Sequence, residues 1–133
     1  MKHITTDKGD IGVLKVAADL VEKGYPVFTP VSATCPFDLL IEKEGFKRVQ
    51  VKYRNVNKHG VVEAHLSRNV ITNSKISRRK NDDVDILAVY CPQTNTCYYI
   101  HTDQFDKTVS LRVITSKNGQ SKNVRLAEDF ENL

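Results

Sequence analysis

The chain has 133 residues, 40% hydrophobic and 27% charged, so we expect one domain, residues 1–133, with a single modest core. No apolar run approaches the roughly 20 residues of a membrane span, which excludes a transmembrane protein, and the composition excludes an intrinsically disordered chain. Residues 42–80 carry eleven Lys and Arg against three Asp and Glu, a net +8, which leaves −4 for the rest of a chain whose total is +4. Such a basic segment is typical of a polyanion-binding surface, although an ordinary solvated surface gives the same pattern.

The start of the chain and its cysteines both indicate a reducing compartment. The first residues lack the apolar stretch of a secretory signal, and Cys35, Cys91 and Cys97 form no CxxC pair. We therefore expect a cytoplasmic protein with reduced thiols, with a bridge between Cys91 and Cys97 as the minor alternative. The four histidines are scattered, without the spacing of a zinc site.

Apolar residues at three- and four-residue spacing predict a helix over residues 7–24. Asp7 or Asp10 would cap its start, and Gly24 would close its end in a left-handed conformation. A short strand follows at 27–29.

Further along the chain, the alternating runs 37–43 and 46–54 predict a β-hairpin. The polar residues 69–83 indicate an exposed loop or a short helix. Other elements are expected as strands at 60–65, 84–91 (buried on both faces), 97–101 and 110–114, a polar loop at 115–123 and a last helical turn on Leu126, Ala127 and Phe130. The order predicts an α/β or α+β domain with a mixed central β-sheet and flanking helices.

The register of the hairpin follows from its loop. A three-residue loop, 43–45, puts Gly45 at the left-handed position and pairs Glu42 with Phe46. Directly opposed residues share a face, so Asp38 lies opposite Gln50. The apolar core face would then carry Phe37, Leu39, Ile41, Val49, Val51 and Tyr53, and the other face Asp38, Glu42, Arg48, Gln50, Lys52 and Arg54.

Three residues of this second face, Asp38, Gln50 and Lys52, make a candidate metal and phosphate site. A carboxylate oxygen and an amide oxygen suit Mg²⁺, with Mn²⁺ as a substitute, and the backbone carbonyl of Val51 would add a third ligand. Lys52 would orient the attacking water or neutralise charge developing on a phosphate. The alternative is a solvent-facing strand with ordinary polar residues.

The segments 36–38 (Pro-Phe-Asp) and 50–52 (Gln-Val-Lys) resemble the PD-(D/E)XK nuclease signature, with Gln in the Asp/Glu position. The surrounding segments extend the likeness over nearly the whole chain: 8–12, 24–25, 37–40, 48–52, 84–90, 111–112 and 117–120. In this order they resemble the small PD-(D/E)XK endonucleases that include a cyanobacterial intron-encoded homing endonuclease. The resemblance implies a restriction-endonuclease-like core, magnesium-dependent hydrolysis of double-stranded DNA, and a homo-oligomer, dimer or tetramer, that pairs its active sites.

The resemblance also assigns roles. Asp38 takes the place of the metal-binding acid, Gln50 that of the variant second position, and Lys52 that of the catalytic lysine. Relatives often carry a Glu on the first helix, where Val13 stands here. Asp10, one turn earlier, is the substitute metal-side acid, and its alternative role is a helix N-cap.

Basic and amide side chains supply the expected DNA contacts, because Lys and Arg bind phosphates, and Arg and Asn can read base edges. The alternative for the part of this set within 69–83 is a solvated loop. For Asp82, Asp83 and Asp85 we favour a role in capping and solvating the start of a buried strand, and membership of the site is the alternative. The expected DNA-binding residues are Arg48, Arg54, Lys58, Asn73, Ser74, Lys75, Arg78, Arg79 and Lys80.

The leading hypothesis is therefore a site-specific, homing-type DNA endonuclease. Three alternatives stay open: a Holliday-junction resolvase, a restriction-type endonuclease with a short palindromic target, and a DNA-binding module whose nuclease site has decayed. Competition between four-way junctions and duplex DNA distinguishes the resolvase from the leading hypothesis, and the length of the target distinguishes the restriction-type enzyme. A DNA-binding module would bind DNA without metal and would not cut it.

Overall fold

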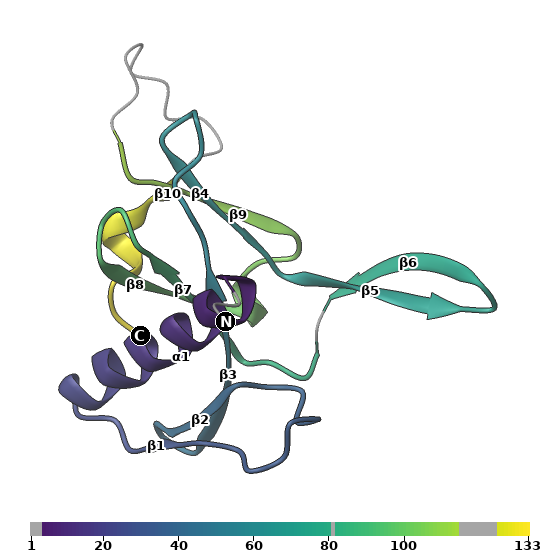
Figure 1. The fold of residues 1–133 in the computed structure, drawn as a ribbon, viewed down its shortest axis with the longest axis horizontal. Helices are drawn as coiled ribbons and strands as arrows, with labels where there is room; N and C mark the ends of the chain where they lie inside the picture. Colours follow the sequence, from purple (N-terminus) through teal and green to yellow (C-terminus); the bar gives the residue numbers. More distant parts are fainter. Residues whose placement is uncertain (1–3, 81, 115–124) are drawn as a thin grey trace.

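The computed structural model describes residues 4–80, 82–114 and 125–133, apart from the side chains of residues 68–70 and 78–80. One helix, α1 (Ile4–Glu22), packs across a five-stranded sheet of order β1-β2-β3-β7-β8 (Figure 1). A three-stranded sheet, β10-β9-β4, and a two-stranded ribbon, β5-β6, complete the described part. The strands are β1 (Val27–Phe28), β2 (Leu39–Glu42), β3 (Phe46–Tyr53), β4 (Val61–His65), β5 (Ser67–Thr72), β6 (Lys75–Lys80), β7 (Ile86–Cys91), β8 (Thr96–His101), β9 (Thr108–Arg112) and β10 (Arg125–Leu126), with 3₁₀ turns η1 (Thr102–Gln104) and η2 (Ala127–Phe130).

The mixed central sheet is confirmed. β3 and β7 run parallel, whereas the pairs β1-β2, β2-β3 and β7-β8 are antiparallel. All six residues of β7 are buried, as its unbroken apolar sequence predicts. The strands predicted at 60–65 and 110–114 do not join this sheet, since β4 and β9 pair with each other and β10 pairs with β9. The predicted polar loop 115–123 lies outside the described residues.

The predicted helix is confirmed, but its start is not. α1 begins at Ile4, so Asp7 lies within its first turn and Asp10 lies in its interior, and the predicted N-cap role of both was wrong. The end is as predicted: Gly24 has φ +91°, and the Tyr25 N–H donates to the Leu20 carbonyl at 3.0 Å, the long bond of a left-handed helix cap.

No helix among the described residues is long and apolar enough to cross a membrane.

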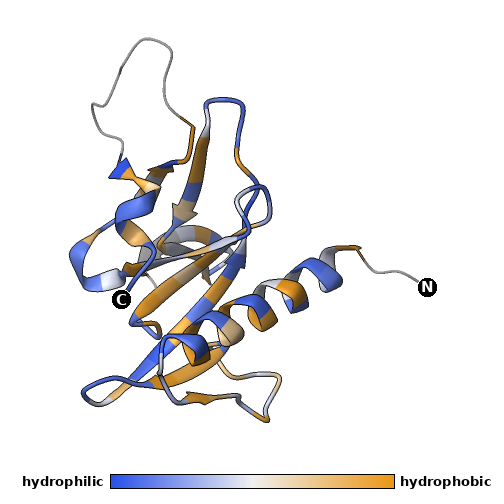
Figure 2. Cartoon of the chain, turned by 90° about the vertical axis from the view of Figure 1, so that its left-hand side faces the viewer, coloured by the Kyte–Doolittle hydropathy of each residue, from blue (hydrophilic) through white to orange (hydrophobic). Residues whose placement is uncertain are grey.

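The central sheet is covered on both faces, and Figure 2 shows long hydrophobic stretches in its strands. Val16 and Leu20 of α1 are fully buried against one face. The second sheet and η2 contribute to the core on the other face. Cys91 belongs to that second core and Cys97 to the α1 core, so the two thiols lie on opposite faces and both are free. The alternative of a bridge between them was wrong.

The prediction of an exposed loop or short helix at 69–83 was wrong. Residues 67–80 form the β5–β6 ribbon, here called the arm, which projects away from the two sheets (Figure 1). Its turn residues, Asn73 and Ser74, have φ of +51° and +63°, the paired left-handed conformations of a two-residue hairpin turn. The polar, basic sequence does not predict strands here, because only Val70, Ile71, Thr72 and Ile76 are residues enriched in strands.

Candidate active site

The β2–β3 hairpin has the predicted register. Leu40 pairs with Arg48 and Glu42 with Phe46 across a three-residue loop, in which Gly45 has φ +107°. One residue before β2 begins, the Asp38 N–H also donates to the Val49 carbonyl at 2.9 Å. The pairing therefore extends to Asp38 and places it beside the middle of β3.

The carboxylate of Asp38 is tied to the backbone of β3. The Val51 N–H donates to Asp38 Oδ2 at 2.7 Å, and Asp38 is half-buried. The N–H and the C=O of one strand residue point to the same side of the strand, so the Val51 carbonyl also points to the side of β3 on which Asp38 lies. No residue of β2 stands opposite Val51 there, because β2 begins at Leu39, which pairs with Val49. One carboxylate and one backbone carbonyl oxygen thus share the same end of the hairpin.

Gln50 and Lys52 flank Val51 on β3. They pair with Leu87 and Val89 of β7, so their side chains share the sheet face that lies away from α1. Both are half-buried, and within the described part of the chain neither side chain makes a hydrogen bond or an ion pair. The predicted set of Asp38, Gln50, Val51 and Lys52 is therefore brought together on one hairpin, with its amide and ammonium groups available to a ligand.

Arg48, two residues before Gln50, is already engaged within the protein. Its Nε and Nη2 donate to the two carboxylate oxygens of Asp85, each at 3.1 Å, and Nη2 also donates to the Asp82 carbonyl. The Arg48 N–H adds a 2.8 Å bond to Asp85. Hydrogen bonding to Asp85 raises the pKa of Arg48, and the same bonds lower the pKa of Asp85. A phosphate contact by Arg48 would have to compete with this ion pair.

The ion pair of Asp85 was missed at the sequence level. The favoured role of Asp85 was to cap and solvate a strand, whereas its carboxylate binds Arg48 and so joins the residue before β7 to β3. The Asp85 N–H also donates to the Arg48 carbonyl at 2.9 Å. Nothing local in the sequence signals this pair, because its partners are 37 residues apart and meet only through the parallel pairing of β3 and β7.

We expect Asp85→Asn to lower the free energy of unfolding by about 1 kcal/mol at neutral pH, the discounted value of a half-exposed charged pair. Because folding lowers the pKa of Asp85, this stabilisation is complete above the unfolded pKa near 3.9 and is lost as the pH falls through the lower folded value. Urea unfolding from pH 7 to pH 3 should therefore show the difference between native protein and variant closing below about pH 4. Asp106→Asn, an exposed acid, is the matched control, and a difference that is constant with pH would contradict the assignment.

α1 packs closely on β3 at Gly12. A Cβ added to this buried glycine would lie 3.3 Å from Val51 Cγ1, so the absent side chain lets the helix pack directly on β3. Asp10, predicted as the substitute metal-side acid, is exposed two residues earlier, and its carboxylate makes no hydrogen bond or ion pair with any described residue. Val13 is half-buried against the α1 core.

The expected DNA-binding residues lie in two places. Arg54 directly follows β3, and its guanidinium donates to the Tyr53 carbonyl at 3.2 Å; Lys58 is exposed in the following turn. Asn73, Ser74 and Lys75 are exposed at the end of the arm. The side chains predicted further along the arm, those of Arg78, Arg79 and Lys80, lie outside the described residues.

The donor chemistry of the site fits a hard divalent cation. Asp38, Gln50 and the Val51 carbonyl offer oxygen only, which Mg²⁺ prefers, and Mg²⁺ usually keeps several waters. Over residues 4–80, 82–114 and 125–133, no three His, Cys, Asp or Glu side chains gather as a metal cluster. One carboxylate therefore supplies the negative charge of this donor set.

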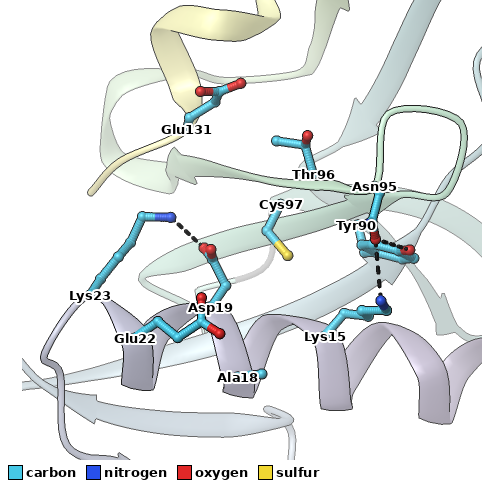
Figure 3. A pocket seen from close by; sticks show the side chains of 10 residues that line it. All are labelled: Lys15, Ala18, Asp19, Glu22, Lys23, Tyr90, Asn95, Thr96, Cys97 and Glu131. Carbon is cyan, nitrogen blue, oxygen red and sulfur yellow. Dashed lines mark hydrogen bonds and ion pairs between the residues drawn. The ribbon is translucent and has the colours of Figure 1, made fainter.

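A polar pocket of about 400 Å³ lies elsewhere, between α1 and the β7–β8 turn (Figure 3). Several of its groups pair with one another: Lys15 and Tyr90 both donate to Asn95, and Lys23 pairs with Asp19. Burial raises the pKa of the Cys97 thiol in this pocket to about 11, so it is protonated and poorly nucleophilic at neutral pH. None of the predicted site residues lines the pocket.

Comparison with known proteins finds a matching family model and a similar fold. The family model of the PD-(D/E)XK endonucleases matches residues 3–133. Among solved structures, a bacterial homing endonuclease, I-Ssp6803I, is similar, with a TM-score of 0.70 and 22% identity over 90% of this chain and 84% of that chain, a likeness that shows the fold. No curated protein matches the chain. The resemblance carried by Asp38, Gln50 and Lys52 is therefore confirmed at the level of the family: the chain belongs to the PD-(D/E)XK endonucleases and is a DNA-cleaving hydrolase.

Proposed function

We propose that this chain is a magnesium-dependent, site-specific endonuclease of double-stranded DNA, of the homing type. The observation that carries the proposal is the β2–β3 hairpin, in which the N–H of Val51, the residue between Gln50 and Lys52 on β3, donates to the Asp38 carboxylate at 2.7 Å. Family membership supports DNA as the substrate, and the endonucleases of this family generally use divalent metals. Free Cys91 and Cys97 suit a reducing compartment, which supports a cytoplasmic enzyme.

Asp38, Gln50 and the Val51 carbonyl would hold the metal. Asp10 would join these ligands only if α1 shifts on DNA binding and brings the Asp10 carboxylate closer to the metal. When bound there, Mg²⁺ would polarise the scissile phosphate and acidify a water. Because the site offers one carboxylate, DNA phosphate would supply much of the missing negative charge, and metal affinity should rise when DNA is bound.

The protein groups would position and stabilise the reacting phosphate. Water attacks the phosphorus in line with the 3′ oxygen; a new P–O bond forms, the P–O3′ bond breaks, and the products are a 5′-phosphate and a 3′-hydroxyl. The Lys52 ammonium would lie beside the charge that develops on the phosphoryl oxygens, and its positive charge would stabilise that charge more in the transition state than in the ground state. Arg54, Lys58 and the basic residues of the arm would bind flanking phosphates.

A pool of long duplexes provides the test of this function. The native protein should cut it at discrete sites in Mg²⁺, with Mn²⁺ substituting, and not in EDTA. Sequencing of the ends would report target length, and four-way junctions added as competitors should not displace the duplex. Salt-sensitive binding without cleavage in any divalent metal would overturn the proposal and favour a DNA-binding module with a decayed site, and a short palindromic target would favour a restriction-type enzyme.

A homo-oligomer, dimer or tetramer, is part of the proposal, because one small domain contacts few base pairs and two sites are needed to cut both strands. An apolar stripe on the outer side of α1 supports it. Ile4, Ile11, Leu14 and Val21 are 63%, 42%, 69% and 59% exposed, and their spacing of seven, three and seven residues is that of a helix–helix seam. Figure 2 shows hydrophobic segments recurring along α1.

We expect Leu14→Lys to raise the dissociation constant of this oligomer at least about tenfold, because it puts a charge in the centre of the stripe, at a cost of more than about 1.4 kcal/mol. Sedimentation velocity at micromolar concentration measures the change. Thr5→Lys adds the same charge at another exposed position of α1 and should leave the mass unchanged. A native protein that stays monomeric with DNA bound would contradict the oligomer and weigh against the homing function.

A further inference from the structure

The arm carries an exposed apolar pair with no place in the nuclease site. Ile71 and Ile76 are directly opposed across β5 and β6, so they share one face of the ribbon, and they are 74% and 73% exposed. They lie one residue pair behind the turn, since Thr72 and Lys75 form the last pair. An isolated two-stranded ribbon is at best marginally stable in water, and this one displays two large aliphatic side chains near its end. Such a pair indicates a surface that is covered when the protein works.

The charge of the arm indicates which kind of partner covers its apolar pair. Residues 67–80 contain five Lys and Arg and no Asp or Glu. Two such arms would repel each other in a symmetric contact, whereas a polyanion would be attracted to either. The apolar pair is therefore best matched by an occupant that is anionic on its outside and has apolar groups within reach.

Double-stranded DNA has this combination in its major groove. The groove is about 12 Å wide and about 8.5 Å deep and admits a two-stranded β-ribbon, and the thymine C5 methyl is the apolar group on its floor. Six residues per strand make the arm about 20 Å long, enough to cross the groove. Asn73, Ser74 and Lys75, exposed at the turn, are suited to the flanking phosphates or base edges.

We propose that the arm lies in the major groove of the target with its Ile71–Ile76 face on the base edges, and that this pair selects thymine at the contacted positions. The proposal rests on the proposed function, because it takes duplex DNA as the substrate, and it adds two specificity-determining residues to it. The basic residues of the arm hold the backbone, and the isoleucine pair reads sequence.

The test is a double-mutant cycle between protein and DNA. Each thymine of the bound site is replaced in turn by uracil, which removes only the C5 methyl, and affinity is measured in EDTA so that no strand is cut. For the native protein, uracil at a contacted position should weaken binding about fourfold, the value of one buried methyl. For Ile71→Ala/Ile76→Ala the same replacement should have no effect. Thr72→Ala, on the other face of the ribbon, should respond to uracil as the native protein does.

Equal uracil effects in the native protein and the isoleucine variant, or none in either, would overturn the proposal. A lower sedimentation mass of the variant without DNA would also overturn it and assign the pair to a contact between copies. Single Ile71→Ala and Ile76→Ala variants retain half of the pair if the double variant misfolds, and each should lose part of the coupling. Because the cycle requires binding only, on a site selected from random duplexes, failure of cleavage leaves this test intact and refutes the nuclease proposal alone.

Discussion

Asp38→Asn is expected to lower the rate of DNA cleavage in Mg²⁺ by about 10³-fold while the protein stays folded. Asn keeps the shape of Asp and an oxygen that can accept the Val51 N–H, so the hairpin should keep its geometry. The substitution removes the charge of the one carboxylate in the proposed donor set of Asp38, Gln50 and Val51. Loss of a Lewis acid worth several kcal/mol, at about 1.4 kcal/mol per tenfold, corresponds to this factor.

Single-turnover cleavage of the selected site measures the effect, and affinity for the site in EDTA tests whether binding survives. Asp103→Asn, an exposed acid in η1, is the matched control and should cut like the native protein. If Asp38→Asn cuts at the native rate, Asp38 does not hold the metal. If it loses DNA binding and the thermal transition together, the residue has a structural role.

Lys52→Met should lower the single-turnover rate by about 10²–10³-fold, the usual loss when one charged donor to a developing oxyanion is removed. Met retains the unbranched stem of Lys, so packing beside Val89 should be kept while the ammonium is lost. Because the charge of Lys52 acts mainly in the transition state, the rate should fall far more than the affinity for DNA.

Two measurements separate this role from general electrostatics. Lys107→Met removes an exposed lysine just before β9 and should change neither rate nor specificity. The salt dependence of binding should be almost the same for Lys52→Met and for the native protein, because phosphate grip is assigned to Arg54, Lys58 and the arm. An affinity loss as large as the rate loss would make Lys52 a binding residue.

The β2–β3 hairpin shows what local sequence signals can predict. Its register was predicted from loop length and alternation alone, and Leu40 pairs with Arg48 as expected. Both signals act within about 15 residues, where a one-residue slip would expose the whole apolar face. The same locality let Gly24 mark the end of α1.

The arm and the ion pair show where local sequence fails. Ile71 and Ile76 are too few among polar neighbours to signal two strands, and Asn73-Ser74 is a weaker turn signal than a pair with glycine. From the sequence, Asp85 was interpreted as a solvated acid. In the fold, the parallel pairing of β3 and β7 brings its carboxylate to Arg48. That pairing joins segments far apart in the chain, so no periodicity records it.

The sequence by itself determined the chemistry of the candidate site and the strand face that carries it, because side-chain alternation has a period of two and the loop that sets the register is local. Tertiary structure alone decided which basic residues are available to DNA. It engaged Arg48 with Asp85 and extended residues 67–80 into a projecting ribbon. Availability depends on which distant strands meet, and that is settled by burial of both sheet faces rather than by any neighbouring residue.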